Sequence, residues 1–112
     1  MGWELIPEGT YKILIEMKRY GKPMYVTESG LADAKDEHRA WFIAEVIKQI
    51  TRAREEGVDV RGYFHWSLTD NFEWDKGFWP RFGLVEVDYQ TLERRIRPSA
   101  LVYKKIIEDS TL

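Results

Sequence analysis

The stretch Pro23-Met24-Tyr25-Val26-Thr27-Glu28-Ser29-Gly30 decides the fold that this chain is expected to adopt. Its first part, residues 23–27, is a short apolar run rich in β-forming side chains, which predicts a buried strand. Glu28-Ser29-Gly30 then ends the run. A carboxylate therefore stands directly after a buried strand, and in parallel α/β barrels the carboxyl ends of the strands carry the active site.

Helical patterns lie on both sides of this strand. Pro7 opens a helix that is predicted to run to Tyr20, where Gly21 and Pro23 stop it. The longest predicted helix spans residues 36–56. Its apolar side chains recur with helical spacing along one face and are Ile43, Val46, Ile47 and Ile50.

A second strand, predicted over residues 60–68, is followed by a long loop over residues 69–81. Residues 83–89 and 94–96 predict a hairpin, and Pro98 opens a last helix. The order strand, helix, strand, helix is typical of a parallel sheet. Because two strands do not make a stable sheet alone, we expect an α/β fold that is one portion of a larger structure.

The composition excludes several classes of function. The chain has 112 residues, no cysteine and a formal net charge of -2, so it has no disulfide framework, thiolate metal site or basic block for nucleic acid. No apolar run is long enough to cross a bilayer, and the N-terminus lacks the layout of a signal peptide. We expect a cytoplasmic protein whose partners include neither nucleic acid nor membrane. Scarce Asn and Gln beside plentiful Lys, Arg and Glu favour a heat-adapted source.

Aromatic side chains are frequent, with five Trp, six Tyr and five Phe in this short chain. Several stand among carboxylates in one stretch, a pattern that suits a sugar site. Apolar sugar faces meet aromatic rings, and carboxylates accept hydrogen bonds from hydroxyls. The residues of this stretch are Trp66, Asp70, Glu73, Trp74, Asp75 and Trp79.

Other polar and aromatic residues favour structural roles. We expect His38 to be solvated, His65 to be a hydrogen-bonded core residue and Trp41 to pack within its helix. No pair of His, Asp or Glu has the spacing of a zinc site, so we expect no metal and no cofactor.

Motifs over nearly the whole chain resemble those of glycoside hydrolase family 1, above all its archaeal heat-stable members. Residues 25–30 resemble the T-E-N-G nucleophile motif, although Ser29 replaces the usual Asn. Residues 62–74 resemble the segment of strand eight and the glycone loop. The remaining matches are Gly2-Trp3-Glu4, Pro7-Glu8-Gly9, Gly77-Phe78, Arg81-Phe82-Gly83-Leu84, Val87-Asp88-Tyr89, Thr91 and Arg97-Pro98-Ser99-Ala100. The resemblance implies that residues 1–112 form one partial (β/α)₈ barrel: the last two βα units and the helix before them.

The resemblance also implies a role for each matching residue. Glu28 corresponds to the nucleophile that attacks the anomeric carbon in retaining glycosidases. Trp66 corresponds to the platform beneath the glycone ring, and Glu73 to the carboxylate that binds the O4 and O6 hydroxyls. Trp74 corresponds to the indole that reaches O3, and Phe82 lines the same pocket.

The general acid of the family is missing from this chain. By spacing alone, Glu28 and Glu73 could serve as nucleophile and acid, because retaining chemistry needs two carboxylates. The resemblance argues against this pairing, since the family's acid lies in an N-E-P motif and Asn71 is the only Asn here. The family's Arg and Tyr beside the nucleophile are absent too. We therefore expect retaining hydrolysis of β-glycosidic bonds in small glycosides only as the C-terminal part of an enzyme, inactive alone.

A non-catalytic alternative stays open: a carbohydrate-binding or self-assembling remnant of a β-glycosidase. Either way, a β-glycoside or sugar is the expected ligand, and a complementary N-terminal barrel chain is an expected partner. Strands that lack barrel neighbours expose edges and apolar surface, so we also expect self-association.

Overall fold

The computed structural model describes residues 1–109, and its strands and helices follow one another as the sequence predicts. The elements are α1 (Glu8–Met17), the 3₁₀ helix η1 (Lys18–Tyr20), β1 (Met24–Ser29), α2 (Arg39–Glu55), β2 (Val60–His65), the 3₁₀ helix η2 (Trp74–Lys76), β3 (Val85–Val87), β4 (Arg94–Ile96) and α3 (Pro98–Asp109).

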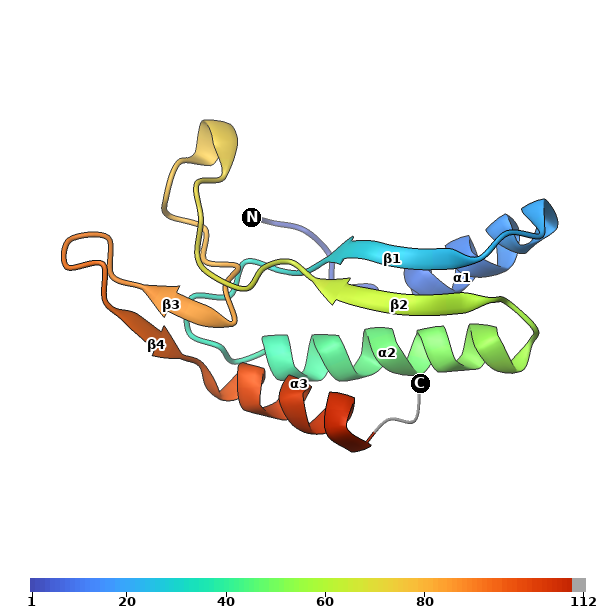
Figure 1. Ribbon diagram of the computed structural model, residues 1–112. Helices are drawn as coiled ribbons and strands as arrows, with labels where there is room; N and C mark the ends of the chain where they lie inside the picture. Colours follow the sequence, from blue (N-terminus) through green and yellow to red (C-terminus); the bar gives the residue numbers. More distant parts are fainter. Residues whose placement is uncertain (110–112) are drawn as a thin grey trace.

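Strands β1 and β2 pair in parallel, which confirms the predicted direction of both strands. Val26 pairs with Tyr63, and Ser29 pairs with His65. Figure 1 shows α2 lying along one face of this sheet with α3 beyond it, whereas no helix of the described part of the chain covers the opposite face. Over residues 1–109 the sheet has two strands, so each strand has one free edge there.

The core lies between the sheet and its helices. Leu14 of α1, Val46 and Ile50 of α2, and Val60 of β2 are buried together. Ile43 and Val46 are fully buried, so the predicted apolar stripe does face the core. Burial of such side chains supplies about 1.5–3 kcal/mol each, which makes this layer the main source of stability.

The start of α2 differs from the prediction, because the helix begins at Arg39 and not at Asp36. Asp36 has a φ of 60°, outside the helical range. Its carboxylate pairs with buried Arg39 and accepts hydrogen bonds from Ser99, at 2.8 Å from the backbone nitrogen and 2.6 Å from Oγ. Asp33 accepts the first free N–H groups of α2, including that of Arg39 at 3.0 Å. Asp36 therefore lies outside α2, and its carboxylate links the start of α2 to the start of α3.

The strand ends also differ from the prediction. β1 continues to Ser29, so Glu28 lies inside the strand and not after it. β2 ends at His65, short of the predicted Leu68. After His65 the chain pairs with a later segment, since the Leu84 nitrogen donates to the Ser67 carbonyl at 2.8 Å.

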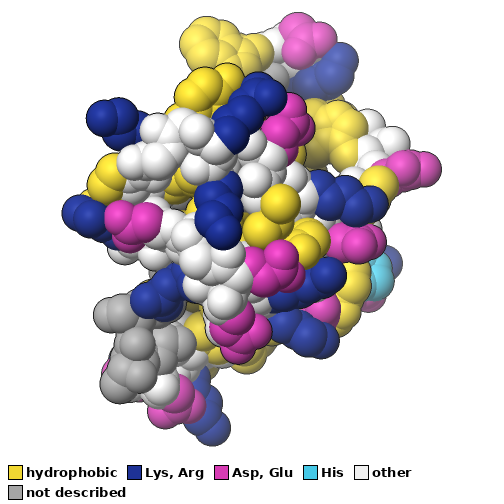
Figure 2. Space-filling model, turned by 90° about the vertical axis from the view of Figure 1, so that its right-hand side faces the viewer, with side chains coloured by type: hydrophobic (Ala, Val, Ile, Leu, Met, Phe, Trp, Pro, Cys, Tyr) yellow, Lys and Arg dark blue, Asp and Glu magenta, His cyan; other side chains and the backbone are white. Residues whose placement is uncertain are grey.

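The predicted hairpin is present but short. β3 and β4 run antiparallel, with Val85 opposite Ile96 and Val87 opposite Arg94. Pro98 starts α3, where its missing N–H is no loss. Figure 2 views the molecule from the side that lies to the right in Figure 1 and shows basic and acidic side chains intermixed, with no region of one sign. Over the described residues, no helix is long and apolar enough to cross a membrane.

Candidate active site

All five side chains singled out from the sequence line one cavity of about 370 Å³ at the carboxyl ends of β1 and β2. β1 contributes Glu28, the residue after β2 is Trp66, and the following loop supplies Glu73, Trp74 and Phe82. Parallel strands bring their carboxyl ends to one edge of the sheet, so these distant segments meet there.

Glu28 is solvent-exposed at the cavity wall. Gly30 follows it where the chain passes against the backbone of Trp66, and a Cβ at this position would collide with the Trp66 carbonyl oxygen. Only glycine permits this close approach. The end of β1 is therefore pressed against the end of β2, and Glu28 and Trp66 line the same cavity.

Glu73 and Trp74 lie at the tip of the loop between β2 and β3. The Glu73 nitrogen donates to the Gly77 carbonyl at 2.7 Å, and the Gly77 nitrogen donates to the Trp74 carbonyl at 3.1 Å. Trp74 is 81% exposed, whereas Phe82 at the base of the cavity is 2% exposed. The cavity thus has an apolar floor, two carboxylates and an indole that projects into solvent.

Three residues of the aromatic and acidic stretch lie outside this cavity, which corrects their assignment to a sugar site. Asp75 is exposed and pairs with Lys76 at 2.7 Å. Trp79 is 58% exposed and is not part of the cavity wall. The carboxylate of Asp70 is fully buried and forms a two-pronged ion pair with Arg97, at 3.0 and 3.1 Å. Sequence spacing cannot separate these carboxylates, because burial depends on the later segment that covers Asp70.

Burial alone would raise the pKa of Asp70. The hydrogen bonds and charge of Arg97, with the N–H groups of Gly83 and Val87, outweigh this effect and hold the pKa below its ordinary value. Asp70 is therefore an ionised structural group.

An aromatic cluster supports the loop from behind. The rings of Phe72 and Phe78 lie 5.2 Å apart, and Phe78 lies 4.6 Å from Tyr89. The Tyr89 hydroxyl donates to the Asn71 carbonyl at 3.2 Å, and Arg81 stacks on the Tyr89 ring at 4.4 Å. These contacts tie the loop to the residues that follow β3.

The histidines show no catalytic arrangement. His65 is half-buried, with its Nδ1 at 3.4 Å from the Tyr63 hydroxyl. Burial and the nearby charge of Arg39 lower the pKa of His65 to about 4, so the ring is neutral at neutral pH. His38 is exposed just before α2. Within residues 1–109, no cluster of three or more His, Asp or Glu is arranged to hold a metal ion.

Trp3, Ser29 and Gly30 also line the cavity, although no role was inferred for them from the sequence. The Trp3 ring lies 6.0 Å from the Phe82 ring and is 58% exposed at the mouth. Trp3 precedes α1 in an irregular segment, where no helical or strand period predicts the direction of a side chain. Two features of the sequence could have indicated Trp3: its aromatic ring, which suits a sugar site, and its position in the motif Gly2-Trp3-Glu4.

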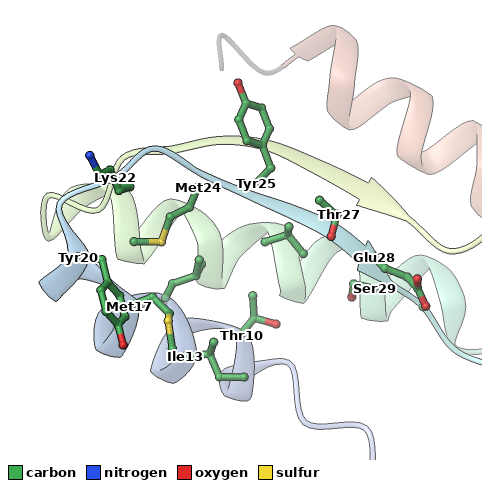
Figure 3. Close-up of a pocket in the computed structure, with 13 residues that line it drawn as sticks. Thr10, Ile13, Met17, Tyr20, Lys22, Met24, Tyr25, Thr27, Glu28 and Ser29 are labelled. Carbon is green, nitrogen blue, oxygen red and sulfur yellow. The ribbon is translucent and has the colours of Figure 1, made fainter.

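A cavity larger than the candidate site lies elsewhere. A groove of about 670 Å³ runs between α1 and the free edge of β1, and we call it the α1–β1 groove. Figure 3 shows Ile13 and Met17 on α1 and Met24 on β1 among the side chains that line it, with Glu28 at one end. Its long wall is mostly apolar and holds no paired carboxylates. It belongs to the open side of the sheet and touches the candidate site only at residues 28–30.

The chain belongs to glycosyl hydrolase family 1, because the model of that family matches residues 1–111. A β-galactosidase of Sulfolobus acidocaldarius is 55% identical over 106 residues, which are 94% of this chain and 22% of that protein. A β-glycosidase structure from Pyrococcus horikoshii superposes with a TM-score of 0.92 at 56% identity, covering 95% of this chain and 25% of that one.

A third similar protein is the β-glucosidase of Thermotoga maritima, solved in complex with castanospermine. Its TM-score is 0.91 at 39% identity, covering 100% of this chain and 28% of that one. The chain thus spans between 22% and 28% of the length of these three relatives, while nearly all of it matches each of them.

Proposed function

We propose that this chain is the C-terminal part of a retaining β-glycosidase that acts on small glycosides. The observation that carries the proposal is the single cavity lined by Glu28, Trp66, Glu73, Trp74 and Phe82. The β-galactosidase and β-glucosidase relatives, of which the chain spans about a quarter, support the same reaction class. The chain then holds the nucleophile and the glycone pocket but not a whole active site.

The proposed place in the fold is the last part of a (β/α)₈ barrel. In this arrangement, α1 is the helix before the last two units, β1 with α2 forms one unit, and β2 with α3 forms the next. Residues 1–112 constitute one partial domain, since a complete barrel needs about 250 residues.

In the proposed mechanism, the Glu28 carboxylate attacks the anomeric carbon and forms a covalent glycosyl-enzyme, which water then hydrolyses. Trp66 presents its ring face to the sugar, and Glu73 accepts hydrogen bonds from sugar hydroxyls. The indole N–H of Trp74 donates to a further hydroxyl, and Phe82 forms the apolar floor.

The proton for the leaving group comes from elsewhere, because the chain has no Asn-Glu-Pro sequence. A positioned general acid is typically worth about a hundred- to ten-thousand-fold in rate. The proposed partner is therefore a complementary chain that supplies the acid and the rest of the barrel. The absence of cysteine supports residence in the cytoplasm.

The experiment is hydrolysis of 4-nitrophenyl β-D-glucoside and β-D-galactoside by the chain alone and by a mixture. The mixture contains the Sulfolobus acidocaldarius relative truncated to remove the segment that matches this chain. We expect no turnover by the chain alone and turnover by the mixture. Glu28→Gln should abolish the activity of the mixture, whereas Glu16→Gln, on the exposed side of α1, should not.

Vigorous turnover by the chain alone, lost in Glu28→Gln, would contradict the proposal. It would require an acid within these residues, and Glu73 would be the first candidate. Glu73→Gln in the isolated chain would then identify it.

A second function is favoured by the same cavity: sugar binding without hydrolysis. Aromatic walls with carboxylates suffice for binding, and the missing acid does not affect it. Binding of castanospermine to the chain, together with no turnover in any mixture, would support this alternative.

A further inference from the structure

The loop that carries Glu73 and Trp74 has both of its ends fastened to one buried carboxylate. Asp70 stands at the start of this loop, and Gly83 follows its end. The Gly83 nitrogen donates to Asp70 Oδ1 at 2.9 Å, and the Val87 nitrogen donates to Oδ2 at 3.3 Å. Asp70 therefore closes the loop at its base.

Two arginines complete this base. Arg97, directly before α3, pairs with both oxygens of Asp70 and also donates to the Gly83 carbonyl at 2.6 Å. Arg81 reaches Asp70 at 3.3 Å and donates to the Val87 carbonyl at 2.9 Å. Ion pairs of this two-pronged form are strong and fix direction as well as distance.

The two ends of the loop are tightly packed against each other at its base. A Cβ at Gly83 would collide with the backbone of Asp70 and Val85, so the two ends of the loop touch there. Toward the tip, Glu73 and Trp74 are held by hydrogen bonds within their own turn. The position of the turn relative to β1 therefore depends on the base and on the aromatic cluster behind it.

The contacts of Asp70 are separate from the main core. The buried side chains of that core lie in α1 and α2 and around the start of β2, whereas the polar partners of Asp70 lie at residues 81–97. Loss of the Asp70 charge should therefore release the loop without melting α2.

We propose that Asp70, held by Arg97, is the positioning residue of the sugar site: it fixes the loop so that Glu73 and Trp74 face Glu28. Asp70 does not touch the ligand. The part of this inference that concerns sugar rests on the proposed function, and the part that concerns the loop does not.

The test uses Asp70→Asn in the full chain. This variant keeps the size of the side chain but turns an amide nitrogen toward groups that are already donors, so the base loses hydrogen bonds to a charged group. The matched control is Asp59→Asn, which removes an exposed carboxylate paired with Arg61 at 2.8 Å. The readout is amide hydrogen exchange, compared between residues 68–88 and residues 42–53 of α2.

We expect exchange over residues 68–88 to rise by about tenfold or more in Asp70→Asn, with α2 unchanged and with no change in Asp59→Asn. An equal rise in both regions would show a general structural role and overturn the inference. No rise in the loop would overturn it too. If Asp70→Asn does not fold, Arg97→Lys, which keeps the charge but loses the two-pronged geometry, is judged by the same two outcomes.

Castanospermine binding separates this inference from the proposed function. If the unchanged chain binds castanospermine, Asp70→Asn should weaken that binding by about tenfold or more, and undiminished binding would overturn the role in the sugar site. If the unchanged chain does not bind it while the loop exchange rises as expected, the positioning of the loop stands and sugar binding by the isolated chain fails.

Discussion

The loop between β2 and β3 and the two-stranded sheet differ in how many of their hydrogen-bonding groups have partners. At the loop end, the buried carboxylate of Asp70 is met by Arg97 and by backbone N–H groups. In the sheet, β1 and β2 each have one edge without a partner strand among the residues that the structure describes. Tyr25 and Phe64, which alternate with core-facing neighbours, are 54% and 58% exposed.

This difference indicates which functions the chain can perform by itself. The loop between β2 and β3 is held at its base by Asp70 and Arg97, so the proposed sugar pocket is supported from within the chain. Among the described residues, each strand of the sheet has one unpaired edge, and the α1–β1 groove in Figure 3 lies along the unpaired edge of β1. A supported loop beside a sheet with unpaired edges agrees with the comparison, in which the relatives are about four times as long as this chain.

The largest expected effect comes from the open sheet. Unpaired strand edges and exposed apolar side chains favour association, so we expect a molar mass by light scattering of at least twice the 13.3 kDa of one chain. Ile13→Asp, which places a charge in the α1–β1 groove, should reduce this mass. Leu92→Asp, equally exposed in the turn after β3, should not. A clean monomer at high concentration would contradict the expectation.

Removing the buried contacts of Arg39 at the start of α2 should lower the stability of the fold. Arg39 is fully buried, pairs with Asp36 and donates to the carbonyls of Asp33 at 2.6 Å and Arg81 at 2.8 Å. Arg39→Ala leaves these groups unpaired and should lower the free energy of unfolding by about 3–5 kcal/mol. Urea unfolding at one fixed protein concentration measures this loss.

Arg61→Ala is the matched control, because its ion pair with Asp59 is exposed. We expect it to cost much less stability than Arg39→Ala, because water screens an exposed ion pair. Equal losses in the two variants would mean that the buried contacts of Arg39 contribute no more than a surface pair.

The sequence was sufficient for features that depend on neighbouring residues. The apolar run before Glu28 and the stripe of α2 gave the strand and the helix, since period and turn residues act locally. The motif around Glu28 and Trp66 likewise singled out residues that line one cavity.

Features that depend on distant partners were missed. Asp36 leaves the helix because its carboxylate meets Ser99, 63 residues away. Asp70 is structural because Arg97, 27 residues away, buries and neutralises it. No periodicity contains either pairing, and the irregular segment that holds Trp3 has no period at all.

A smaller effect should appear in the pH dependence of stability. The pKa of His65 is lowered to about 4 from its ordinary 6.5 by burial and by the charge of Arg39, partly opposed by the Phe82 backbone and by the charge of Asp36. The unfolded chain therefore binds this proton more readily. Above pH 6.5, His65 is neutral in both states and does not reduce the free energy of unfolding. As the pH falls from 6.5 toward 4, protonation of His65 in the unfolded chain lowers this free energy by an amount on the order of 3 kcal/mol.

His65→Gln should flatten this decline in urea unfolding measured between pH 4 and 6.5, and exposed His38→Gln should leave it unchanged. An unaltered slope in His65→Gln would assign the decline to other groups.

The smallest expected effect concerns the exposed indole at the loop tip. If the chain binds castanospermine as the proposed function requires, Trp74→Ala should weaken that binding by about fivefold, as expected for about 1 kcal/mol of aromatic contact. Trp79→Ala removes an exposed indole outside the cavity and should have no effect. Titration of the two variants side by side distinguishes a pocket wall from general surface, and equal losses would contradict the assignment of Trp74.

The most direct test of the central claim is covalent labelling of Glu28 by a 2-deoxy-2-fluoro glycoside with a good leaving group, read by mass spectrometry of the peptide that contains it. Such a substrate needs little acid assistance, so it reports on the nucleophile and its surroundings. The account predicts a stable glycosyl adduct on Glu28 when the truncated relative is present, and none in the chain alone or in Glu28→Gln. An adduct on another residue of the chain, or turnover by the mixture with Glu28 unlabelled, would contradict it.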